Sequence, residues 1–113
     1  MGRSQPTEVP EGAAVMPLVP DELGVHPLLL AALHAVVFLQ GSDEKVVAPA
    51  AADEQLELIA ACLQRLQGAE LQRVREDISV LSNYAKEQRW PKSAEQFFSN
   101  FLADFGVGRD RKK

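Results

Sequence analysis

The stretch His26–Gly41, HPLLLAALHAVVFLQG, decides the fold of this chain because it has almost no polar side. Within it, the thirteen residues Pro27–Leu39 contain a single polar side chain, that of His34. A surface helix normally carries a polar face, and a helix that is apolar all round is buried or contacts another apolar surface. The stretch is too short to cross a membrane, which takes about 20 apolar residues. We therefore expect no membrane insertion, and the helix needs a protein surface to cover it.

The residues ahead of this stretch argue against a secretory signal. A signal peptide begins with a positively charged region, whereas a single base, Arg3, stands here against four acids: Glu8, Glu11, Asp21 and Glu22. The chain has one cysteine, so it cannot form the internal disulfides of small secreted domains. These features and a length of 113 residues predict a single cytoplasmic domain.

Prolines and glycines divide the chain into four predicted helices. Pro27, Pro49 and Pro91 each open an apolar periodic segment, and proline suits the first helical turn because its missing N–H has no partner there. A glycine follows each of three segments, as a left-handed C-terminal cap requires: Gly41, Gly68 and Gly106. The predicted helices are Pro27–Gln40, Pro49–Gln67, Ala69–Arg89 and Pro91–Phe105.

In the last three segments, apolar residues recur at spacings of three and four, which places them on one face of each helix. The last segment has the widest stripe, which is aromatic: Phe97, Phe98, Phe101 and Phe105. Trp90 is expected to pack over Phe97 or Phe98 at the corner before this segment. Short links between segments imply antiparallel neighbours. The predicted fold is therefore all-α, a small antiparallel bundle of about four helices.

The two ends of the chain differ from this middle part. The first twenty residues hold four of the seven prolines and have no apolar period, which is typical of a disordered segment. The last six residues are rich in lysine and arginine. We therefore divide the chain into a disordered N-terminal arm (1–20), a helical bundle domain (21–107) and a basic C-terminal tail (108–113).

The first helix is predicted to form an intermolecular contact. Three amphipathic helices cannot cover every side of it, and an exposed apolar remainder is an aggregation liability unless a partner covers it. The expected partner is a second copy in a homodimer, the commonest assembly, or else another protein. The expected contact residues are Leu29, Leu30, Ala32, Leu33, His34, Val36 and Val37. In the alternative, the N-terminal arm folds back over the helix with Val15, Leu18, Val19 and Leu23.

No group of residues forms a recognisable catalytic, cofactor or metal site. His34 has no carboxylate at helical spacing, and a metal site needs several ligands. His26 is expected near the helix start as a capping residue, and Cys62 is expected in the core, where a thiol is inert. Glycine-rich phosphate loops and zinc motifs are absent from the sequence. We therefore expect a non-enzymatic interaction module, such as an adaptor, an immunity or antitoxin-like factor or a small chaperone, with no cofactor and no evident small-molecule substrate.

The competing hypothesis is a small DNA-binding regulator. Residues 1–57 carry nine acids and two bases, a net charge of −7, whereas residues 58–113 carry seven acids and ten bases, a net charge of +3. The second and third helices resemble a helix-turn-helix with LQRVREDISVL as recognition helix. Its charges, however, have the spacing of intrahelical pairs, such as Arg73 with Asp77. The basic excess is also small for a DNA-binding domain, so nucleic acid is not the expected partner.

Overall fold

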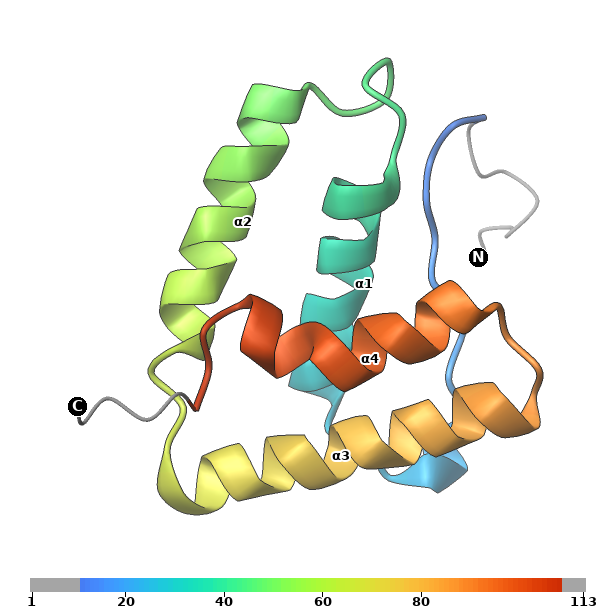
Figure 1. The fold of residues 1–113 in the computed structure, drawn as a ribbon, viewed down its shortest axis with the longest axis vertical. Coiled ribbons are helices and arrows are strands. Elements are labelled where there is room, and N and C mark those ends of the chain that lie inside the picture. Colours follow the sequence, from blue (N-terminus) through green and yellow to red (C-terminus); the bar gives the residue numbers. More distant parts are fainter. Residues whose placement is uncertain (1–10, 109–113) are drawn as a thin grey trace.

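Helices make up all the regular secondary structure between residues 11 and 108, which are the residues that the computed structural model describes (Figure 1). They are α1 (Pro27–Gly41), α2 (Pro49–Leu63), α3 (Gly68–Glu87) and α4 (Lys92–Asp104), with a short 3-10 helix, η2 (Asp21–Leu23), ahead of them. The prediction of an all-α fold with four α-helices is confirmed over these residues. None of these helices has the length and hydrophobicity that a membrane-spanning helix requires.

The four helices form two pairs of neighbours. α1 contacts α2, and α3 contacts α4. The two members of each pair run in opposite directions, and in Figure 1 α4 crosses in front of α1 while α3 lies beyond the N-terminal end of α1. The fold is thus two crossed helical hairpins rather than four helices along a common axis. The short links determine which helices are paired, whereas the crossing depends on how the two apolar surfaces pack.

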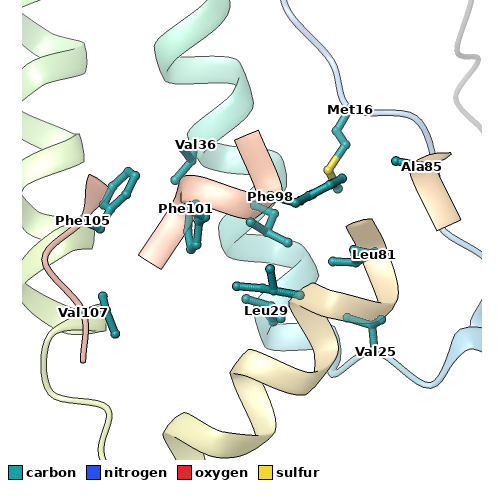
Figure 2. Packing of buried hydrophobic residues seen from close by; sticks show 12 residues of the cluster. Met16, Val25, Leu29, Val36, Leu81, Ala85, Phe98, Phe101, Phe105 and Val107 are labelled. Atoms are coloured by element: carbon teal, nitrogen blue, oxygen red, sulfur yellow. The ribbon is translucent and has the colours of Figure 1, made fainter. Parts of the chain in front are cut away.

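The core lies where the two hairpins cross (Figure 2). The buried apolar side chains of α1, α3 and α4 are Leu29, Leu33 and Val36 in α1, Ile78, Leu81 and Ala85 in α3, and Phe98 and Phe101 in α4. Phe105 and Val107, directly after α4, complete this side of the core. The aromatic stripe is therefore a core element, as predicted. In α2, Ala52 is buried, whereas the larger apolar residues on the same face are half-buried: Leu56, Ile59 and Leu63.

α2 ends earlier than predicted, at Leu63 rather than Gln67. The last turn tightens, and the N–H of Leu66 donates to the carbonyl of Leu63 at 3.0 Å. Leu66 still packs against the core, so it continues the apolar period although the helix has ended. Gly68 has a left-handed φ of 60°, but it begins α3 and does not cap α2.

Gly106 and Gly41, the other two glycines predicted to cap helices, have different structural roles. Gly106 has a left-handed φ of 70°, and the next residue, Val107, donates its N–H to the carbonyl of Leu102 at 2.8 Å. This arrangement is the glycine cap that the sequence predicts for α4. Gly41, in contrast, is the last residue of α1 and has no left-handed φ. A Cβ there would lie 2.8 Å from the Cβ of Ala14, so the glycine allows a close approach of the N-terminal segment.

Residues 11–20, which the sequence assigns to a disordered arm, follow a defined path along the bundle. The side chain of Met16 is 4% exposed and points toward Phe98 in the core (Figure 2). The predicted arm boundary at residue 20 is corrected accordingly. A single apolar anchor in an extended segment leaves no periodic pattern in the sequence. The rest of the predicted arm, residues 1–10, and residues 109–113 of the predicted tail lie outside the described residues.

Backbone hydrogen bonds hold the beginning of this segment against the loop after α1. The N–H of Asp43 donates to the carbonyl of Gly12 at 2.8 Å, and the N–H of Ala14 donates to Oγ of Ser42 at 2.9 Å. Of the four residues expected to cover α1 in the fold-back alternative, Val15 and Leu18 are 57% and 80% exposed. The other two, Val19 and Leu23, are half-buried and pack against the core. The segment therefore covers one flank of the bundle and does not cover α1 completely.

Candidate protein interface

The side chains predicted to contact a partner divide into two groups. Leu29, Leu33 and Val36 are 6%, 0% and 0% exposed, so the chain itself covers them and a second chain cannot reach them. This placement contradicts the predicted contact for these three residues. The remaining four are half-buried and flank the buried stripe: Leu30, Ala32, His34 and Val37.

The exposed side of α1 lies opposite this buried stripe. It is formed by Leu28, Ala31, Ala35 and Phe38, which follow one another at spacings of three, four and three and are all exposed. Leu28 is 75% exposed and Phe38 is 38% exposed. His34 is half-buried beside this surface. α1 therefore presents two large apolar side chains with two alanines between them.

α2 extends this surface. One side of α2 carries Asp53 and Glu57, which line a pocket together with Asp104 and Phe105 at the end of α4. The opposite side is turned away from α4 and carries four exposed, uncharged residues at spacings of four, three and four: Ala51, Gln55, Leu58 and Cys62. Leu58 is 57% exposed.

We call the combined surface the outer face. Its Leu28 end lies beside α3, because Leu28 lines a pocket together with Glu70 and Val74. Its members are Leu28, Ala31, Ala35 and Phe38 from α1 and Ala51, Gln55, Leu58 and Cys62 from α2. None of these eight residues is charged, although a quarter of the chain is. Exposed Glu54 borders these residues on α2, three residues after Ala51 and four before Leu58. A largely apolar exposed surface is typical of a protein contact site.

The sequence could not distinguish the outer face of α1 from its buried stripe. Both are apolar, and periodicity alone does not tell which side of such a helix meets the core. On α2 the sequence did indicate a second apolar surface, because Leu58 and Cys62 are four residues apart and lie outside the apolar stripe. Cys62 was instead expected in the core, and this prediction is wrong, because the thiol is exposed. The apolar stripe of α2 that packs against the core includes Ile59 and Leu63, which precede and follow Cys62 in the sequence.

The remaining chemistry-bearing residues have structural roles. Nδ1 of His26 accepts a hydrogen bond of 3.1 Å from the N–H of Leu28, which confirms it as the N-terminal cap of α1. Trp90 packs on Tyr84 and Phe98 with ring centroids 5.7 and 6.2 Å apart, as predicted for the corner between α3 and α4. Among residues 11–108, no three His, Cys, Asp or Glu side chains form a group that could hold a metal ion.

Arg73 and Asp77 form the predicted ion pair on α3. Nε of Arg73 lies 3.0 Å from both carboxylate oxygens of Asp77. The pair is partly buried, because Asp77 is 6% exposed whereas half of the Arg73 side chain is exposed. The guanidinium also donates to the carbonyl of Gly24 at 3.0 Å. These two charges of the predicted recognition helix therefore bind groups of the same chain.

Comparison with known proteins places the chain in no family. No protein-family model matches it, and no curated protein or solved structure shows significant similarity to it. Any functional assignment therefore depends on the geometry and chemistry of the outer face itself.

Proposed function

We propose that this chain is a non-enzymatic protein-interaction module that pairs with a second copy of itself through the outer face. The observation that carries the proposal is the apolar surface of eight exposed, uncharged residues on two neighbouring helices, with exposed Glu54 at its edge on α2. Covering it stabilises a complex by about 25 cal/mol for each Å² of apolar surface removed from water. A lone monomer would leave this surface exposed to nonspecific association.

A second copy fits the outer face for geometric reasons. The alanines Ala31 and Ala35 let another helix backbone approach closely, since the distance between packed helices depends on the side chains at the contact. Leu28 and Phe38 lie about one turn beyond the alanines on either side, so a symmetry-related α1 can place its large side chains beside the small ones. A two-fold axis requires such a self-complementary surface. The exposed free thiol of Cys62 also favours action in a reducing compartment, and we place the module in the cytoplasm.

The single cysteine provides a direct test on the unaltered chain. Cys62 lies on the outer face and is exposed in the monomer. We expect its rate of modification by a maleimide to fall as protein concentration rises from the nanomolar to the high micromolar range. Light scattering on the same samples should show the mass doubling in parallel. Urea-unfolded protein is the control, because its thiol should react at one rate at every concentration.

Two outcomes would count against the proposal. A monomeric mass at high micromolar concentration would exclude self-association through any surface. A dimer whose Cys62 reacts as fast as that of the monomer would show that the copies meet elsewhere, and would remove the outer face from the contact.

A further inference from the structure

The order of side chains on the exposed side of α1 is the same from either end. A large side chain, two alanines and a second large side chain follow one another: Leu28, Ala31, Ala35 and Phe38. A second α1 can therefore lie on this side in either direction. In the antiparallel direction, Leu28 of one copy lies beside Phe38 of the other, and the alanines meet between them. The apolar residues of α1 alone thus leave the direction open.

Two charges on α2 differ between its ends. Glu54 is exposed near the beginning of the helix, and Arg65 is exposed in the turn that follows Leu63. The N–H of Arg65 donates to the carbonyl of Cys62 at 3.1 Å, so this turn continues the helical path. Eleven residues make about three helical turns, which places both charges along one edge of α2, about 16 Å apart. Exposed Ala61 lies between them on this edge.

Neither charge is used within the described chain. The single ion pair formed among residues 11–108 is that of Arg73 with Asp77. Glu54 and Arg65 therefore remain available at the border of a largely apolar surface. Charges at the rim of an apolar contact determine the orientation of the partners more than the affinity.

From this arrangement we infer that the two copies meet antiparallel, with Glu54 of each copy against Arg65 of the other. The inference rests on the proposed pairing through the outer face and adds its direction. A parallel contact would bring each charge to the same height as its own equivalent, and like charges oppose association. In the antiparallel contact acid meets base, and the two-fold axis produces this pair twice.

Charge reversal tests the direction on the full chain by sedimentation equilibrium. Glu54→Arg and Arg65→Glu each place like charges at both sites of an antiparallel homodimer. Each should raise the homodimer Kd at least about tenfold, because two exposed pairs change from attraction to repulsion. An equimolar mixture of the two variants should form a heterodimer within about threefold of the parental Kd, since every reversed charge then meets its opposite.

Matched controls separate the contact from effects on the helices. Asp53→Arg makes the same charge change one residue before Glu54, on the side of α2 that lines a pocket with Asp104. Arg75→Glu is its counterpart for Arg65, at an exposed position beside α4. Both controls should dimerise like the parent, and urea unfolding should show that every variant is folded.

Disulfide cross-linking gives a second measurement that needs no charge reversal. In the Cys62→Ser background, Glu54→Cys and Arg65→Cys are oxidised separately and as a mixture. A disulfide requires Cα atoms about 4.4–6.8 Å apart. In the antiparallel dimer the two copies of one position lie about 16 Å apart along α2. We therefore expect a cross-linked dimer in the mixture and none in either variant alone.

The outcomes distinguish the direction from the pairing itself. A parent that is monomeric would remove both. A parental dimer whose Kd changes in neither Glu54→Arg nor Arg65→Glu would overturn the antiparallel direction and leave the outer face as the contact. Cross-linking within each single cysteine variant would likewise replace the antiparallel contact with a parallel one.

Discussion

The backbone N–H of His26 donates a hydrogen bond of 3.0 Å to the carboxylate of Asp77, which lies 51 residues further along the chain. The same carboxylate accepts from Arg73, and Arg73 in turn donates to the carbonyl of Gly24. The start of α1 is thereby fixed to the middle of α3. Since His26 also caps α1 through its side chain, this one cluster sets where α1 begins and which of its sides meets the core.

Replacing Asp77 with alanine should destabilise the fold by about 2 kcal/mol, because the partly buried N–H of His26 and the charged Arg73 both lose their acceptor. Arg73→Ala should cost less, about 1 kcal/mol, because half of the Arg73 side chain is exposed and solvent screens the pair. Urea unfolding measures both. Glu76→Ala, at an exposed position of the same helix, is the control and should change stability by less than about 0.5 kcal/mol. Equal stabilities of the Asp77 and Glu76 variants would show that the cluster contributes nothing.

The C-terminal end of α3 should become more stable with a glycine. Arg89 has a left-handed φ of 59°, and Trp90 beyond it donates its N–H to the carbonyl of Ala85 at 2.9 Å. Glycine adopts this conformation without the steric cost that other residues bear, so Arg89→Gly should raise stability by about 0.5–1 kcal/mol. Arg89→Ala removes the same side chain but keeps the cost, and it should show no gain. A gain in the alanine variant would assign the effect to the lost charge.

Phe101 anchors the core from α4. It is 1% exposed and packs edge-on against Phe97 and at a tilt against Phe105, with ring centroids 5.5 and 4.9 Å apart. Phe101→Ala should therefore cost about 3–5 kcal/mol through lost burial and the cavity left behind. Phe97→Ala, at the half-buried edge of the same stripe, should cost clearly less. Thermal or urea unfolding measures the stability of both variants. Similar losses of stability at both positions would mean that the aromatic stripe is buried evenly.

Residues 11–20 contribute to stability through one side chain. Met16→Ala should cost about 2 kcal/mol or more, because Met16 is buried against the core. Leu18→Ala, two residues later at an 80% exposed position, should be nearly neutral. Parental stability in both variants would return this segment to the disordered arm that its composition suggests.

The sequence predicted the number and order of the helices because proline, glycine and apolar spacing act locally. It predicted the aromatic core and the Arg73–Asp77 pair for the same reason, since each lies within one helix. It failed where contacts over long sequence distances decide: Met16 enters the core from an extended segment, and Gly41 is required by the approach of Ala14. The exposed side of α1 depends on where α3 and α4 pack, and no spacing within α1 encodes that.

Sedimentation equilibrium shows whether two copies of the chain pair through the outer face. Ala35→Glu places a charge in the middle of the outer face at an exposed position, where it should not disturb the monomer. Ala103→Glu places the same charge on an exposed position of α4. We predict a dimer for the parent and for Ala103→Glu, and a folded monomer for Ala35→Glu at the same concentration. A parent that sediments as a monomer, or an Ala35→Glu variant that dimerises as tightly as the parent, would rule out dimerisation through the outer face.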